Sequence, residues 1–163
     1  MRPIYETKTD VANERQIADQ LERAWSCSLM KLSKPLSNVD MVAVRDGRVV
    51  ALVEIKRRKY TSGQIQAWGG YMISLDKIKE GLAYSRAAGL PFILAVGLAD
   101  GTFTIRVDDA TPDVVRIGGR SDRGDAKDIE VVVLYDMQRF RRIQGHDNER
   151  RPDLSGGAVG TGA

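Results

Sequence analysis

The sequence predicts an α/β fold in which a mixed central β-sheet is flanked by helices. Apolar residues recur at helical spacing over residues 11–26 and 76–88, and short apolar runs typical of strands lie between and after these two segments. The chain has 163 residues, of which 42% are hydrophobic, enough for a single core. We therefore expect one domain over residues 1–143. The apolar pattern stops at Gln144, so residues 144–163 are expected to be a flexible tail.

The first half of the chain predicts a helix followed by a β-hairpin. The helix is expected over residues 11–26, and two apolar runs follow at residues 39–44 and 49–55. Asp46-Gly47 between these runs is a strong hairpin signal. Both runs are largely apolar on both faces, which is typical of strands that are covered on both sides.

The second half predicts a crossover connection. Residues 76–88 form a helix pattern that ends at a Gly-Leu-Pro stop signal, and a buried strand is expected at residues 92–96. That strand should run parallel to an earlier one, because a helix of this length is a suitable crossover. Residues 61–74 contain a pair of adjacent glycines and predict only a short helix or turn. Further strands are expected at residues 102–107, 114–117 and 129–135.

Composition excludes several classes of protein. The single cysteine, Cys27, cannot form an intramolecular disulfide, and the chain begins without the apolar core of a signal peptide. The longest apolar run, residues 90–99, is about half the length that spans a bilayer. We expect a cytoplasmic protein with no membrane segment. The sequence has a single histidine, His146, which excludes histidine-rich zinc sites and argues against nucleases that use histidine bases.

Three charged residues, Asp40, Glu54 and Lys56, interrupt the apolar hairpin. Burying an unpaired charge costs several kcal/mol, so their presence needs a reason. Side chains alternate along a strand, which puts Glu54 and Lys56 on the same face. A regular two-residue turn would place Asp40 on the other face, whereas a three-residue loop starting at Arg45, or a bulge elsewhere, would place it beside Glu54. If these residues form a functional site, the hairpin must therefore contain a loop with an odd number of residues or a bulge.

Acids placed this close together favour a bound cation. Two neighbouring carboxylates repel each other, and Lys56 neutralises only one of the charges. An oxygen ligand set without His or Cys favours Mg²⁺ or Mn²⁺ over zinc. Glu14 lies on the apolar stripe of the first helix and should face the sheet as a further acid. The alternatives are an ordinary salt bridge between Glu54 and Lys56, and pairing of Glu14 with Lys56 or an arginine.

These residues resemble the PD-(D/E)XK nuclease superfamily, which has the restriction-endonuclease-like fold. The resemblance spans residues 10–107 by element order, and is carried by Asp40, by Glu54-Ile55-Lys56 and by Glu14 on the preceding helix. More narrowly, the chain is similar to small phage-encoded, VRR-type and Holliday-junction-resolving members. Asn-Val precedes the aspartate where the family name has a proline.

The resemblance implies a role for each of these residues. Asp40, Glu54 and the Ile55 carbonyl would bind Mg²⁺ or Mn²⁺, and Glu14 would bind a second metal or its water shell. Lys56 would orient the attacking water or stabilise charge on the phosphate.

Residues around this site are candidates for contacts with nucleic acid. Four cations follow one another directly after the predicted catalytic strand, and of these Arg58 shares the face of Lys56, whereas Arg57 should point away. The alternatives are that Lys77 is a solvated lysine, that Gln64 is a surface glutamine, and that Arg120 and Arg123 pair with acids in their own loop. Trp68, Tyr71 and Tyr84 either stack on bases or belong to the core. The candidates for nucleic-acid binding are Arg58, Gln64, Lys77, Arg120 and Arg123.

The function expected from these features is a metal-dependent nuclease, in particular a structure-selective DNA endonuclease. No helix suited to reading a groove is evident, so recognition of branched or single-stranded DNA is favoured over recognition of a base sequence. A homodimer would suit the cutting of two strands, and a phage-encoded enzyme would act in the host cytoplasm. The alternative is a nucleic-acid-binding or assembly module that keeps the nuclease fold without catalysis.

Overall fold

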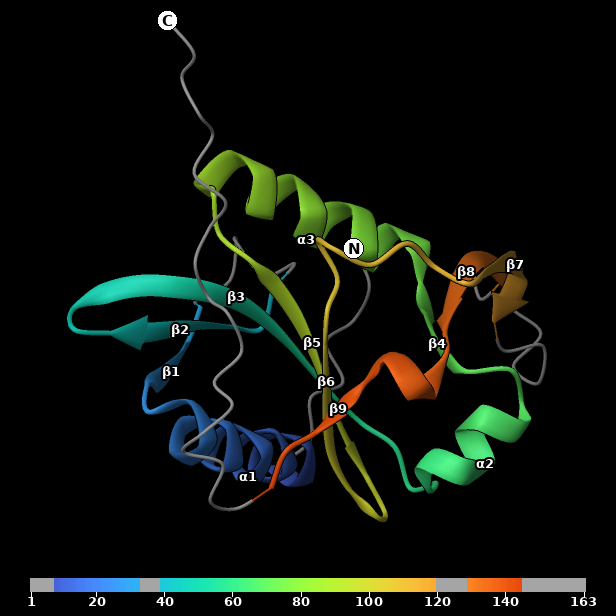
Figure 1. The fold of residues 1–163 in the computed structure, drawn as a ribbon, viewed down its shortest axis with the longest axis horizontal. Helices are drawn as coiled ribbons and strands as arrows, with labels where there is room; N and C mark the ends of the chain where they lie inside the picture. Colours follow the sequence, from blue (N-terminus) through green and yellow to red (C-terminus); the bar gives the residue numbers. More distant parts are fainter. Residues whose placement is uncertain (1–7, 33–38, 120–128, 145–163) are drawn as a thin grey trace, which may run out of the picture.

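The computed structural model describes residues 8–32, 39–119 and 129–144, and its centre is a six-stranded mixed sheet (Figure 1). The strands lie in the order β1-β2-β3-β5-β6-β9, and all neighbours are antiparallel except β3 and β5. The mixed sheet flanked by helices is thus confirmed. The predicted tail lies outside the described residues apart from Gln144. The strands of this sheet are β1 Ser28–Lys31, β2 Met41–Arg45, β3 Arg48–Arg57, β5 Phe92–Leu98, β6 Gly101–Arg106 and β9 Arg141–Arg142.

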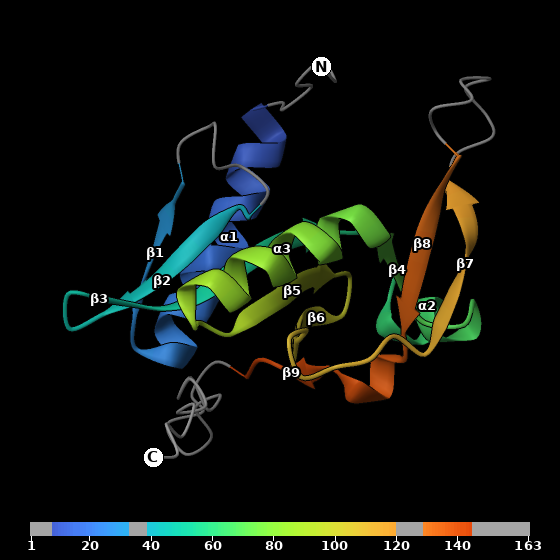
Figure 2. The ribbon, with the colours of Figure 1, turned by 90° about the horizontal axis from the view of Figure 1, so that it is seen from above.

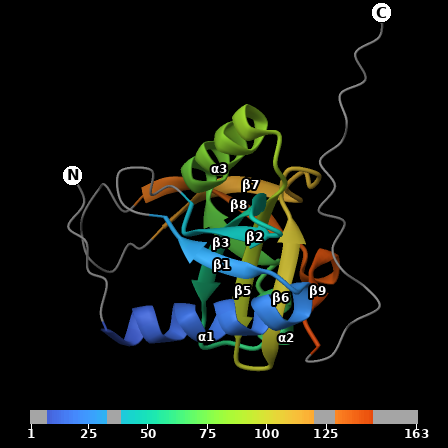
Figure 3. The same cartoon turned by 90° about the vertical axis from the view of Figure 1, so that its left-hand side faces the viewer.

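Two long helices cover opposite faces of the central sheet (Figure 3). Helix α1 (Lys8–Trp25) buries Ile17 and Leu21 against a core that includes Val53 and Ile55 of β3. Helix α3 (Leu75–Ala88) packs on the other face. Because side chains alternate along β3, Glu54 and Lys56 extend from the face toward α3, while Ile55 and Arg57 extend toward α1.

The connection from β3 to β5 is the predicted crossover, and the two strands are parallel as expected. It contains α2 (Ser62–Ala67), β4 (Tyr71–Ser74) and α3, and Figure 2 shows α3 lying along the sheet. Helix α3 comes so close to β5 that a Cβ atom added at Gly81 would overlap the ring of Phe92. None of the helices in the described part of the chain is long and apolar enough to cross a membrane.

A second, three-stranded antiparallel sheet was not predicted. Its strands are β4, β8 (Ile129–Tyr135) and β7 (Val114–Gly119), in that order, and a short 3₁₀ turn, η2 (Met137–Arg139), follows β8. The sequence indicated only a helix or turn where β4 forms, because two glycines precede the strand. Gly70 has a φ of +112°, and a Cβ there would lie 2.5 Å from the Tyr135 carbonyl oxygen. This glycine therefore permits the close approach that starts the strand.

The β2–β3 hairpin has a two-residue turn and a bulge. Asp46 and Gly47 both have positive φ, 50° and 72°, which is the type I′ turn that suits a hairpin. Of the two alternatives that the sequence left open, the three-residue loop therefore does not form. The register nevertheless shifts between Ala43 and Val44. The requirement for an odd loop or a bulge is thus confirmed.

The bulge sets the partner of Asp40. Beyond the shift, Met41 lies opposite Val53. Asp40, which directly precedes β2, therefore comes opposite Glu54, on the same face of the sheet. Without the extra residue of the bulge in β3, a two-residue turn would have left these two carboxylates on opposite faces.

Candidate active site

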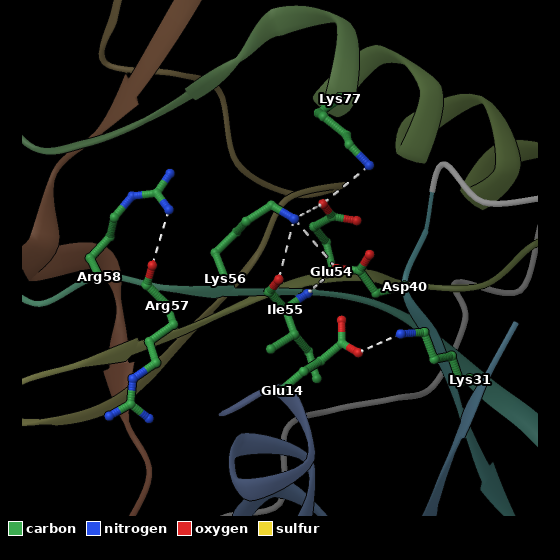
Figure 4. Close-up of polar contacts among 9 residues, drawn as sticks. All are labelled: Glu14, Lys31, Asp40, Glu54, Ile55, Lys56, Arg57, Arg58 and Lys77. Atoms are coloured by element: carbon green, nitrogen blue, oxygen red, sulfur yellow. Dashed lines mark hydrogen bonds and ion pairs between the residues drawn. The ribbon is translucent and has the colours of Figure 1, made fainter. Parts of the chain in front are cut away.

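The ammonium group of Lys56 lies at the point where three oxygen atoms converge (Figure 4). Its Nζ is 2.5 Å from Glu54 Oε1, 3.4 Å from Asp40 Oδ2 and 3.3 Å from the Ile55 carbonyl oxygen. The backbone N–H of Ile55 donates a hydrogen bond of 2.9 Å to Asp40 Oδ2 and so holds that carboxylate in place. The structure thus brings together the residues that the sequence proposed as a site.

Glu54 is a buried carboxylate between two lysines. It is 1% exposed, and Lys77 of α3 places its Nζ 3.4 Å from the same Oε1 that faces Lys56. The second oxygen, Oε2, is buried and has no hydrogen-bond partner among the described residues. A buried oxygen in this position is able to accept a further positive ligand.

The electrostatics of this cluster follow from its burial. Burial raises the pKa of Glu54, an effect that Lys56 and Lys77 oppose and Asp40 reinforces. For Lys56, burial by itself lowers the pKa, but the carboxylates of Glu54 and Asp40 outweigh it, so the pKa of Lys56 is raised. Lys56 is therefore a protonated ammonium near neutral pH. It is suited to donate hydrogen bonds and to stabilise negative charge, and not to act as a base.

The converging oxygens fit a divalent cation. Within the described residues, no three Asp, Glu, His or Cys side chains form a metal site by themselves, and the protein oxygens available here are two carboxylates and the Ile55 carbonyl. Two carboxylates and a carbonyl are hard oxygen donors of the kind that Mg²⁺ and Mn²⁺ prefer. The Lys56 ammonium at their centre shows that this point favours positive charge.

A cleft of about 320 Å³ opens beside this cluster and extends to α1. Glu14 lines the cleft and is 16% exposed, which confirms that it faces inward. Its Oε2 lies 2.9 Å from Nζ of Lys31, on a strand that the sequence did not predict. Among the residues that the structure describes, Glu14 therefore pairs with Lys31 and not with Lys56 or an arginine. Its assignment as a metal ligand stays a prediction.

Arg57 is a cleft residue that the sequence analysis missed. It was expected to point away from Lys56, and it does, toward α1, where its Nη1 donates to Gln16 Oε1 at 3.2 Å. The cleft extends to that side, however, so Arg57 and Arg58 both line it. Strand alternation located the side chain correctly. Only the position of α1 shows that both faces of the strand end border the same space.

The remaining predicted contacts have different outcomes. Gln64 completes a capping box at the start of α2, where its Oε1 accepts a hydrogen bond of 2.9 Å from the Thr61 N–H, and it does not line the cleft. Lys77 places its ammonium 3.4 Å from Glu54 Oε1 while its side chain stays 34% exposed, and its contact with nucleic acid stays a prediction. Arg120 and Arg123 lie outside the described residues.

Comparisons with known proteins identify both a family and a fold. The family model described as "Phage putative PDDEXK endonuclease" matches residues 1–143. Among solved structures, Hjc, a Holliday junction resolvase from the archaeal hyperthermophile Archaeoglobus fulgidus, superposes with a TM-score of 0.54 at 14% identity, over 83% of this chain and 93% of Hjc. At that identity the likeness shows the fold alone, and the fold is the restriction-endonuclease-like one that was predicted. Comparison with curated proteins gave no match.

Proposed function

The chain belongs to the phage PDDEXK endonuclease family, and from this premise we propose that it is a metal-dependent DNA endonuclease selective for DNA shape. The observation that carries the proposal is the convergence of Asp40, Glu54 and the Ile55 carbonyl on one cationic point beside an open cleft. The shared fold with a Holliday junction resolvase supports branched DNA as a substrate. The cytoplasmic location and the homodimer stay predictions.

The site has the parts needed for phosphodiester hydrolysis. Asp40, Glu54 and the Ile55 carbonyl would hold one divalent cation, Mg²⁺ or Mn²⁺, which when bound supplies Lewis-acid activation of a phosphate and of a water. The protonated Lys56 then stabilises negative charge that develops on the phosphate, or orients the attacking water. Lys77, on the other side of Glu54, favours the ionised carboxylate through its positive charge.

The rim of the cleft favours a nucleic-acid backbone. Arg57 and Arg58 lie at the end of the strand that carries Glu54 and Lys56, and both line the cleft. Contacts between such cations and phosphates supply most of the affinity of proteins for nucleic acids. These contacts place a phosphate at the oxygen cluster without reading the bases.

Cleavage of labelled duplex, single-stranded and four-way-junction DNA tests this function. Wild-type protein with Mg²⁺ or Mn²⁺ should cut at least one of these substrates, with EDTA abolishing the reaction and Glu54→Gln lowering the rate by on the order of 100-fold. Lys77→Met should also lower the rate, whereas Lys79→Met, an exposed lysine on the same helix, should not. Cutting that persists in EDTA, or a cleavage rate that Glu54→Gln leaves unchanged, would contradict the proposal. Tight DNA binding without cleavage of any of the three substrates would favour the non-catalytic nucleic-acid-binding module.

A further inference from the structure

A second pocket, of about 170 Å³, shares Arg58 with the cleft and is otherwise lined by residues in or next to α2, β4, β7 and β8. These four elements are labelled in Figure 1. We propose that this pocket binds one unstacked nucleobase of the DNA substrate, beside the phosphodiester bond that is cut. The proposal rests on the proposed function and extends it by naming what the enzyme recognises. The residues that argue for it are Arg58, Tyr60, Trp68, Tyr71 and Arg116, all of which line the pocket.

Trp68 provides a stacking surface in this pocket. Its side chain is 55% exposed, whereas the other tryptophan, Trp25, is 1% exposed in the core. The ring of Tyr60 meets Trp68 edge to face, with centroids 4.8 Å apart and planes at 87°. Tyr60 therefore restrains the indole while Trp68 stays open to solvent. An exposed, restrained aromatic ring is the usual platform on which proteins stack single bases.

Tyr71 adds an unused hydrogen-bonding group. It is 1% exposed, and its hydroxyl is buried with no hydrogen-bond partner among the residues that the structure describes. A buried hydroxyl without a partner costs free energy, and tyrosine hydroxyls usually find one. Tyr71 lines the pocket, and a nucleobase carries ring nitrogens and exocyclic groups that pair with such a hydroxyl.

The charge of the pocket selects a nucleotide over an apolar peptide. Arg58 and Arg116 contribute two guanidinium groups, and no acidic residue of the described chain lines the pocket. The apolar wall, which includes Ile65 and Leu134, suits the flat face of a base, while the arginines suit phosphates. This combination of aromatic platform and cations is typical of sites for single-stranded nucleic acid.

The position of Arg58 connects the pocket with the catalytic cleft. Arg58 lines both spaces, and its guanidinium carbon lies 5.9 Å from the centre of the Tyr71 ring. It follows Lys56 by two residues, so a base in the pocket belongs to a nucleotide close to the phosphate at the oxygen cluster. In continuous duplex DNA that base must first leave its stack, whereas an unpaired base in the single-stranded arm of a flap or fork is already free. The pocket thus gives a physical reason for selectivity by DNA shape.

Binding measured without cleavage tests the pocket. Wild-type protein in EDTA is titrated with a forked DNA that carries one unpaired 2-aminopurine, with the same fork abasic at that position, and with a continuous duplex. We expect 2-aminopurine fluorescence to be quenched on binding, and Trp68→Ala to weaken binding of the fork about tenfold while leaving duplex affinity unchanged. Trp68→Phe should retain most of the affinity. Met30→Ala, which removes an exposed apolar side chain outside the pocket, should have no effect.

The abasic fork keeps the test valid whatever the stability of the variants. On wild-type protein it should bind about as weakly as the intact fork binds Trp68→Ala, and on Trp68→Ala it should show no further loss. Equal affinity of wild type for the intact and abasic forks would overturn the inference, as would an equal loss for fork and duplex on Trp68→Ala. Because these binding measurements need no cutting, their outcome is independent of the outcome of the cleavage assay. Failure of Glu54→Gln to reduce cleavage contradicts the proposed function and leaves the base pocket to be judged by binding.

Discussion

Glu54 is the residue in which function and stability conflict. It is a carboxylate that burial holds at a raised pKa even though two lysines face it. A raised pKa means that the folded protein binds the proton more tightly than the unfolded chain, whose value is near 4.5. The contribution of Glu54 to stability is therefore fully present below about pH 4.5 and is lost as the pH rises through the raised pKa.

Replacing Glu54 with glutamine should increase stability at neutral pH. Glu54→Gln keeps the shape of the side chain and removes a charge whose burial outweighs its attraction to the lysines, so we expect a higher free energy of unfolding at pH 7 in metal-free buffer. The gain should shrink as the pH falls and vanish below about pH 4.5, where the wild-type carboxyl becomes protonated in the unfolded chain as well as in the folded one. Urea unfolding of wild type and Glu54→Gln, at pH 7 and at about pH 4.5, measures this difference in the free energy of unfolding. Glu80→Gln, on the exposed side of α3, is the matched control, and a less stable Glu54→Gln would show that the lysines need the charge.

The central residues of the site could be predicted one by one from the sequence. The residues that surround the site could not. Asp40, Glu54 and Lys56 stand out because charges inside an apolar hairpin are costly. Arg57 was missed, and Gln64 completes a capping box outside the cleft while its contact with nucleic acid stays a prediction. Strand alternation and charge say nothing about which space a side chain enters.

At the scale of elements, α3 positions Lys77 through its close packing on β5. Gly81 lies one turn after Lys77, and a Cβ there would overlap the ring of Phe92. The helix therefore sits closer to the sheet than any residue with a side chain at this position would allow. The distance between Lys77 and Glu54 depends on that contact.

Alanine at Gly81 should destabilise the protein although it favours the helix. The gain in helix propensity is about 1 kcal/mol, but overpacking against Phe92 costs roughly 1–3 kcal/mol and moves α3 outward, so Gly81→Ala should lower both stability and cleavage rate. Gly63→Ala in α2 is the control, because a Cβ there meets nothing closer than 4.0 Å, and it should leave stability unchanged or raised. Thermal unfolding measures the stability of the two variants, and the cleavage assay measures their rates. Equal stability of the two variants would show that α3 adjusts freely.

At the scale of the whole molecule, metal binding should be linked to folding. The oxygen atoms of Asp40, Glu54 and Ile55 come together only when the hairpin pairs with its bulge in place. A cation that binds this arrangement and not the unfolded chain stabilises the fold by mass action.

Divalent metal should therefore raise the melting temperature. At about 100 times its dissociation constant, Mg²⁺ or Mn²⁺ should add roughly 2.7 kcal/mol to the free energy of unfolding, and EDTA should reverse the effect. Differential scanning calorimetry measures the shift. The shift should be absent in Glu54→Gln and intact in Glu80→Gln, and an equal shift in wild type and Glu54→Gln would place the metal elsewhere.

The sequence by itself determined the principal helices, the hairpin, the parallel crossover and the acids and lysine of the site, because each leaves a local periodicity, turn signal or misplaced charge. Only the tertiary structure decided where the extra residue of the hairpin is absorbed, that Lys77 faces Glu54, that Lys31 holds Glu14, and that a second sheet forms. It also decided that Arg58 borders two pockets at once. These features arise from contacts between segments far apart in the chain, and no local pattern records which segments become neighbours.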